Sequence, residues 1–127
     1  MGDYVRLPDA ELEVMQALWA QKEYPASSGE LMEHLRGKHW RLPTLLKLLS
    51  RLEERGFVAR EKDGRANLYS PLVKEADYLA AETRSFLERL HAGSLPSLVA
   101  ALVDSKAISE ADLRELEELL KGGTQDA

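Results

Sequence analysis

The chain has 127 residues, of which 44% are hydrophobic and 6% aromatic, and its formal net charge at pH 7 is −5. This length allows one compact core with a short appendage and excludes two large domains. The absence of cysteine excludes a disulfide framework, a thiolate zinc site and a cysteine nucleophile. No apolar run resembles a signal peptide or approaches the ~20 residues that span a bilayer, so we expect a soluble, cytoplasmic protein without membrane insertion.

The charge is distributed unevenly along the chain. Residues 1–73 carry 11 Lys and Arg against 11 Asp and Glu, whereas residues 74–127 carry 6 against 11. Between His34 and Arg65 there are nine basic residues and only four acidic ones. A confined positive patch of this kind favours binding to nucleic acid phosphates, because it can displace condensed counterions. The same patch is also consistent with a solvated basic face that binds no partner.

Three helices are predicted in the first half of the chain. Leu12, Met15 and Leu18 follow helical spacing within residues 9–21. Ser27, with a glutamate three residues later, forms a capping-box pattern that begins a second helix through residue 36. A third helix is predicted over residues 43–55. It begins with a proline, which suits a first helical turn, and a glycine follows its last residue.

The third predicted helix has two chemically different faces. Leu45, Leu48, Leu49 and Leu52 form one stripe that should pack in the core. Thr44, Lys47 and Arg51 lie together on another face, where we expect them to enter the major groove of DNA. Leu46 borders this face and is expected either to meet a thymine methyl group or to close the edge of the core. Arg51 could instead pair with Glu53 or Glu54.

A β-hairpin is predicted after the third helix. Residues 57–61 and 66–70 are short extended runs, and the Asp63-Gly64 step between them is a strong hairpin signal. Lys62 and Arg65 at its tip would contact phosphates or the minor groove, although a solvated turn is the plain alternative. Tyr69 is expected to pack rather than to bind. The predicted DNA-binding residues are Arg41, Pro43, Thr44, Leu46, Lys47, Arg51, Lys62 and Arg65.

Amphipathic helices are predicted over residues 74–92, over residues 96–105, and from Ser109 onward, where Asp112 completes a cap. Their apolar stripe is too long to be buried on itself, so a dimer interface is its simplest use, and a helical lid over the same core is the alternative. The predicted dimerisation residues are Phe86, Leu90, Leu95, Leu98, Val99, Leu102, Val103, Leu113, Leu116 and Leu120.

The predicted fold is therefore mainly α with a small β-hairpin. An N-terminal winged helix-turn-helix DNA-binding domain, residues 1–73, is followed by a helical dimerisation region, residues 74–121, and by a disordered tail, residues 122–127.

Several motifs in this order resemble the penicillinase-repressor (BlaI/MecI) family of bacterial winged-helix repressors, over residues 7–121. In the N-terminal part the matching segments are 12–15, 18–19, 44–52, 54–58 and Tyr69. In the C-terminal part they are 93–95, 97–99, 102–104, 109–113, 116 and 119–120.

The resemblance implies a cytoplasmic homodimer that binds a palindromic operator and blocks transcription, with the third helix of each protomer in the major groove. It also implies a sensor-protease or another inducing partner, because in well-known members a membrane sensor that detects a β-lactam triggers cleavage in the dimerisation helices. The family's scissile Asn-Phe pair falls on Ala101-Leu102 here, so the sequence does not support release by cleavage at that pair. The cysteine cluster of the related copper-responsive repressors is absent as well.

The third helix also departs from the family pattern. Pro43 and Leu46 stand where other members have Lys or Thr, and Arg. These differences predict either an operator unlike the β-lactamase type or weaker binding.

Other functions have less support in the sequence. His34, His39 and His91 are scattered without metal-ligand spacing, and no nucleophile motif or glycine-rich phosphate loop is present, so we predict no enzyme activity, metal or cofactor. A winged helix that has become a protein-interaction module, without specific DNA binding, is the main alternative, because a fold does not fix a function. A repressor gated by a small molecule lacks a convergent set of polar residues.

Overall fold

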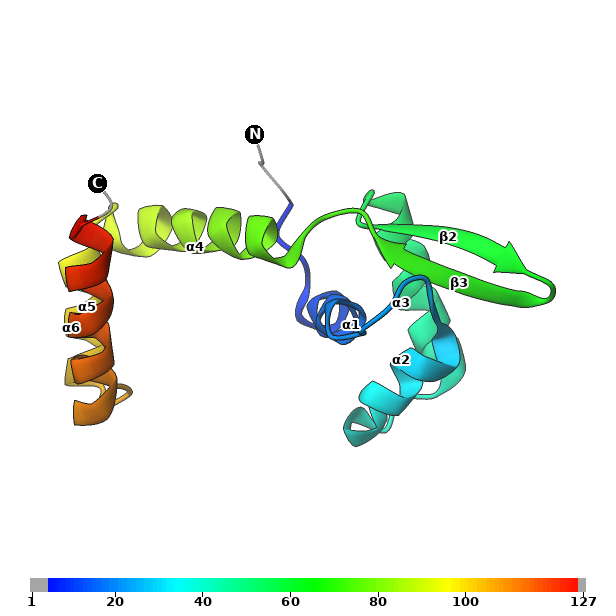
Figure 1. Cartoon of the computed structure of the whole chain (residues 1–127), viewed down its shortest axis with the longest axis horizontal. Helices are drawn as coiled ribbons and strands as arrows, with labels where there is room; N and C mark the ends of the chain where they lie inside the picture. The colour runs from blue at the N-terminus through cyan, green and yellow to red at the C-terminus, as the bar shows by residue number, and fades with distance from the viewer. Residues whose placement is uncertain (1–4, 126–127) are drawn as a thin grey trace. The chain divides into compact units, whose positions relative to one another are not determined.

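The computed structural model describes residues 5–125 and folds them mainly into helices, with one small sheet (Figure 1). In chain order the elements are α1 (Asp9–Trp19), β1 (Ala26–Ser27), α2 (Ser28–His34), the 3-10 helix η1 (Arg36–Lys38), α3 (Leu42–Glu54), β2 (Val58–Asp63), β3 (Ala66–Pro71), α4 (Glu75–His91), α5 (Leu95–Asp104) and α6 (Glu110–Gln125). The chain divides into two compact units, residues 1–82 and 83–127, which are described separately.

The first three helices confirm the predicted boundaries within a few residues. The Ser27 cap forms in full, since the Glu30 N–H donates to Ser27 Oγ at 3.1 Å and the Ser27 N–H donates to Glu30 Oε1 at 2.8 Å. Gly56 follows α3 with a φ of +81°, a conformation that favours glycine and turns the chain toward β2.

The sheet contains a strand that the sequence did not predict. Its order is β1-β3-β2 with both pairs antiparallel, and the two residues of β1 pair with Tyr69 and Leu68. The prediction of a hairpin alone was therefore incomplete. Two residues are too few to show strand alternation, and their partner lies about forty residues away, so no local pattern marks them.

The core of the first unit is built from the inward faces of α1, α2, α3 and the sheet. Leu45, Leu48, Leu49 and Leu52 are all buried, which confirms the predicted inward stripe of the third helix. Tyr69 is 3% exposed, so the prediction that it packs is also confirmed. The remaining core side chains are Leu7, Val14, Met15, Ala17, Leu18, Ala26, Leu31, Leu35, Phe57, Val58, Val73 and Tyr78.

Tyr78 of α4 belongs to this core, so the first unit extends beyond the predicted boundary at residue 73. Its ring meets Phe57 edge-on, with ring centroids 5.7 Å apart, and its hydroxyl accepts the Leu7 N–H at 2.9 Å. Nearby, the Trp19 indole N–H donates to the Val73 carbonyl at 2.9 Å. The structure therefore ends the first unit after Glu82 and not after residue 73, because the first turn of α4 completes its core.

We expect Tyr78→Phe to lower the free energy of unfolding by about 1–3 kcal/mol, because it leaves the buried Leu7 N–H without this acceptor. Urea denaturation followed by circular dichroism measures the change. Tyr24→Phe is the matched control, since the Tyr24 hydroxyl donates to a carbonyl from an exposed position and should matter by less than about 0.5 kcal/mol. Equal losses in both variants would contradict the assignment.

The second unit contains capped helices but no buried side chain among residues 83–122. The Ser97 N–H donates to Ser94 Oγ at 3.1 Å, which caps α5. Ser109 and Asp112 cap α6 reciprocally at 3.0 Å, and the hydrogen bonds from the Ser109 backbone and side chain hold the pKa of Asp112 below its usual value.

The end of the chain differs from its prediction. The helix α6 continues to Gln125, past residue 122 where the disordered tail was predicted to begin, and residues 126–127 lie outside the described part of the chain. Glycine weakens a helix by only about 1 kcal/mol per residue and does not end it by itself, so α6 continues through the glycine pair at 122–123. None of the helices described here is long and apolar enough to cross a membrane.

Candidate DNA-binding surface

The burial of one leucine stripe fixes which side of α3 faces solvent. Thr44, Lys47 and Arg51 follow one another at spacings of three and four residues, and all three are exposed. Arg41 is the N-cap residue of α3 and Pro43 lies in the first turn, and both are exposed as well. The structure therefore brings the predicted groove-facing residues together on the accessible side of one helix.

Leu46 lies on the open side of α3. It is 37% exposed and is not one of the core residues, so it does not close the edge of the core. Leu42, which the sequence prediction placed in the turn before the helix, is the first residue of α3 and is 45% exposed. The four-residue spacing between these two leucines was the available signal that they share a side.

Ion pairs divide the nine basic residues of the patch into two groups. Four of them are paired with carboxylates: Arg36 with Glu33 at 2.9 Å, Lys38 with Glu13, Arg55 with Glu11 at 2.6 Å and Arg60 with Glu53 at 3.1 Å. Within residues 5–125, the other five form no ion pair and are exposed: Arg41, Lys47, Arg51, Lys62 and Arg65. These five are the cations that the sequence predicted to bind DNA. In the described structure Arg51 forms an ion pair neither with Glu53, which pairs with Arg60, nor with Glu54.

The pair between Glu11 and Arg55 is structural, and the sequence did not reveal it. Glu11 is 1% exposed, whereas the Arg55 side chain is 33% exposed. This contact ties α1 to the residue that caps the C-terminus of α3. Arg55 therefore contributes to the position of α3, although it lies within the basic stretch of the sequence.

The hairpin carries its two free cations at and near its tip. Lys62 lies within β2 opposite Asn67, and Gly64 and Arg65 form a two-residue loop, with a φ of +66° at Gly64. The predicted four-residue tip is therefore shorter in the structure, because the strands pair out to residues 63 and 66. Lys62 is two residues from Arg60, on the same strand face, and the hairpin projects beyond α3 (Figure 1).

Tyr69, opposite Arg60 on β3, adds no charge to this surface. Burial raises the pKa of its hydroxyl, and the nearby Arg60 only partly opposes the shift. No group of three or more His, Asp or Glu side chains that could hold a metal ion is found within residues 5–125.

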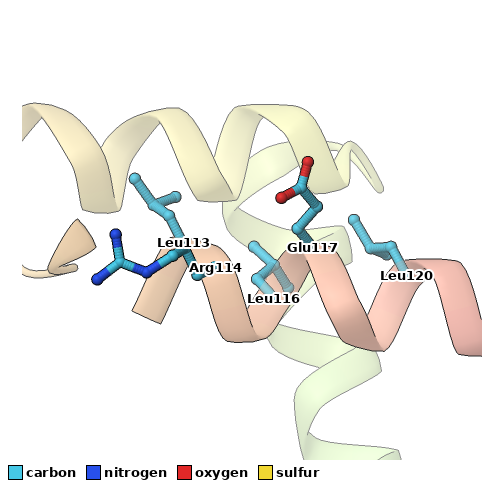
Figure 2. Close-up of a pocket in the computed structure, with 5 residues that line it drawn as sticks. All are labelled: Leu113, Arg114, Leu116, Glu117 and Leu120. Atoms are coloured by element: carbon cyan, nitrogen blue, oxygen red, sulfur yellow. The ribbon is translucent and has the colours of Figure 1, made fainter. Parts of the chain in front are cut away.

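A second surface, on residues 83–122, is apolar. All ten predicted dimerisation residues are exposed or half-buried, and Leu119, which was not predicted, is 71% exposed. On α6 a shallow hollow of about 320 Å³ is lined by Leu113, Leu116 and Leu120 together with Arg114 and Glu117 (Figure 2). Apolar side chains left uncovered on successive turns indicate a protein–protein contact surface.

The fold and the cationic surface define a winged helix-turn-helix protein of the DNA-binding class, as the sequence predicted. The penicillinase repressor family model matches residues 7–122. A penicillinase repressor of Bacillus licheniformis is 32% identical over 117 residues, 91% of this chain and 90% of that protein. The methicillin resistance regulatory protein MecI of Staphylococcus aureus (strain N315) is 31% identical over 114 residues, 90% of this chain and 92% of that protein.

Solved structures of a related repressor match this fold over about three fifths of the chain. The solution structure of the DNA-binding domain of the repressor BlaI superimposes with a TM-score of 0.51 at 33% identity, covering 61% of this chain and 94% of that one. The monomeric form of Bacillus licheniformis BlaI in complex with the blaP half-operator gives a TM-score of 0.50 at 32% identity, with the same coverage. This chain belongs to the penicillinase repressor family, a family of transcriptional repressors and not of enzymes.

Proposed function

We propose that this protein is a cytoplasmic transcriptional repressor that binds a palindromic operator as a homodimer, with α3 of each protomer in the major groove. The observation that carries the proposal is that ion pairing divides the basic residues into a paired group and an unpaired group. Of nine cations in one stretch of sequence, the five without an ion pair in the described structure lie on α3, at its N-cap, or on the hairpin. An unpaired, exposed cation can bind a phosphate without breaking an ion pair within the protein, because it releases only water and counterions.

We expect α3 and the hairpin to make different contacts with the DNA. Lys47 and Arg51 are long donors on an exposed helix, and such side chains donate to guanine O6 and N7 in the major groove. Lys62 and Arg65 stand on a hairpin beside that helix and would contact the backbone. The monomeric form of BlaI solved in complex with a half-operator is 32% identical to this chain, which supports DNA binding by this chain.

The homodimer rests on the apolar surface of residues 83–122. Leu90 is 60% exposed and Leu120 is 51% exposed, so a single copy leaves these side chains in water. A second copy offers the same surface, and a two-fold contact covers both at once. Such a dimer sets two α3 helices one or two DNA turns apart, ~34 Å for each turn, which matches a palindromic operator.

Two lysine substitutions test the division of roles. We expect Lys47→Ala to weaken binding to a specific duplex by about 1–3 kcal/mol and to relax sequence preference. We expect Lys62→Ala to weaken binding to specific and random duplexes alike and to flatten the dependence of log K on log salt. Fluorescence anisotropy with a duplex selected by the protein from a random pool, and with a scrambled version of it, measures both effects.

Lys22→Ala is the matched control, because it removes the same charge from an exposed loop position outside α3 and the hairpin. Its binding should stay within about 0.5 kcal/mol of the parent protein. Equal losses on specific and scrambled DNA for Lys47→Ala and Lys62→Ala would defeat the assignment of base contacts to α3.

A further inference from the structure

The N-terminal half of α3 exposes apolar side chains next to its cations. Leu42 is 45% exposed, Leu46 is 37% exposed, and Pro43 between them is exposed as well. Leu42 and Leu46 are four residues apart and therefore lie on successive turns of one side of the helix. Two exposed leucines on successive turns form a small apolar patch, and burying it against a partner surface would be favourable.

The apolar side of α3 is distinct from its cationic side. Lys47 and Arg51 are also four residues apart, and they are rotated away from the line through the two leucines. Glu53 follows Leu46 by seven residues, on nearly the same line, and it pairs with Arg60 of β2. The apolar edge formed by Leu42 and Leu46 therefore lies on the same side of α3 as Glu53, which contacts the hairpin.

We propose that this apolar edge recognises thymine, with Leu46 packed against the C5 methyl group of a thymine in the major groove. The inference rests on the proposed function and deepens it, because it names a base feature of the operator. The thymine methyl is the apolar feature that the major-groove edges of the base pairs present, and cytosine carries hydrogen at the same position. Burying this methyl against a leucine is favourable, whereas a leucine facing a cytosine or a polar edge gains less.

The charges around the edge favour DNA over a protein partner. Arg41 precedes it at the N-cap, Lys47 and Arg51 lie beside it, and Lys62 and Arg65 stand on the neighbouring hairpin, all without an ion pair in the described structure. An apolar strip bordered by five unpaired cations is complementary to a ligand that has anionic groups at its edges and an apolar group between them. A DNA major groove lined by phosphates, with thymine methyl groups in its floor, has these properties.

Selection of duplexes from a random-sequence pool, followed by a uracil scan of the enriched duplex, tests the proposal. Uracil lacks the methyl group and keeps the hydrogen-bonding edge of thymine. We expect replacement of one thymine in each half-site to weaken binding about fourfold per half-site, the effect of one buried methyl group. Leu46→Ala should weaken binding to the thymine duplex by a similar factor and should abolish the difference between thymine and uracil at that position alone.

Leu72→Ala is the matched control, since Leu72 is 60% exposed in the same unit but lies outside α3 and the strands. This variant should keep the full discrimination between thymine and uracil. Enrichment of a sequence in which no thymine position is coupled to Leu46 would overturn the thymine inference and leave the proposed function standing. If no sequence is enriched at all, the proposed function fails, and the inference fails with it.

Discussion

Arg55→Met should lower the free energy of unfolding by about 3 kcal/mol, at the lower end of the cost of breaking a buried ion pair. The Glu11 carboxylate is 1% exposed and lies 2.6 Å from the Arg55 guanidinium, so the substitution leaves a buried charge without its partner. The lower end applies because the Arg55 side chain is itself 33% exposed, and water would reach part of the vacated space. Urea denaturation monitored by circular dichroism gives the change.

Two further variants distinguish the effect of breaking the buried pair from the effect of removing any positive charge. Arg60→Met breaks the exposed pair with Glu53 and should cost at most about 1 kcal/mol. The double variant Glu11→Leu with Arg55→Met removes both charges and should recover most of the lost stability, because no buried charge remains unpaired. If Arg55→Met costs no more than Arg60→Met, the Glu11–Arg55 pair does not hold α1 to α3.

Leu102→Asp should separate the proposed homodimer and weaken operator binding by about 100-fold or more. Leu102 is 36% exposed on α5, between the half-buried Val99 and the exposed Val103, so a carboxylate there would have to be buried in the proposed interface. A monomer keeps one half-site contact and loses the second, which the dimer gains at high effective concentration. Sedimentation velocity and operator binding, measured on the same preparation, test both parts.

Ala100→Asp is the control for this prediction. Ala100 is exposed on the same helix, and its position two residues from Leu102 places it on a different side. This variant should sediment and bind like the parent protein. An unchanged sedimentation coefficient for Leu102→Asp would refute its place in a dimer interface.

The predictions that succeeded depend on local signals. The Ser27 capping box, the glycine that ends α3, and the leucine stripe of α3 each involve residues within about two helical turns. Periodicity of 3.6 residues then determined which face of α3 is buried, and hence which residues are exposed. The winged helix-turn-helix fold could therefore be predicted from the sequence almost in full.

The features that were missed depend on contacts between distant residues. The strand β1 pairs with β3 about forty residues later, Tyr78 packs against Phe57 and receives the Leu7 N–H, and Glu11 pairs with Arg55. Sequence spacing carries no signal for such contacts. The sequence selected the five unpaired cations by their place on a helix face or on the hairpin, but it did not show that the other four basic residues are held by carboxylates.

The most direct test of the account is a competition experiment between the intergenic DNA upstream of this protein's own gene and random DNA of equal length, across a salt series. We predict preferential binding to the upstream DNA, with an affinity for both that falls steeply as log salt rises, because phosphate contacts release counterions. Equal or absent binding to both DNAs, without a salt slope, would contradict a sequence-specific repressor and would favour a winged helix that binds protein instead.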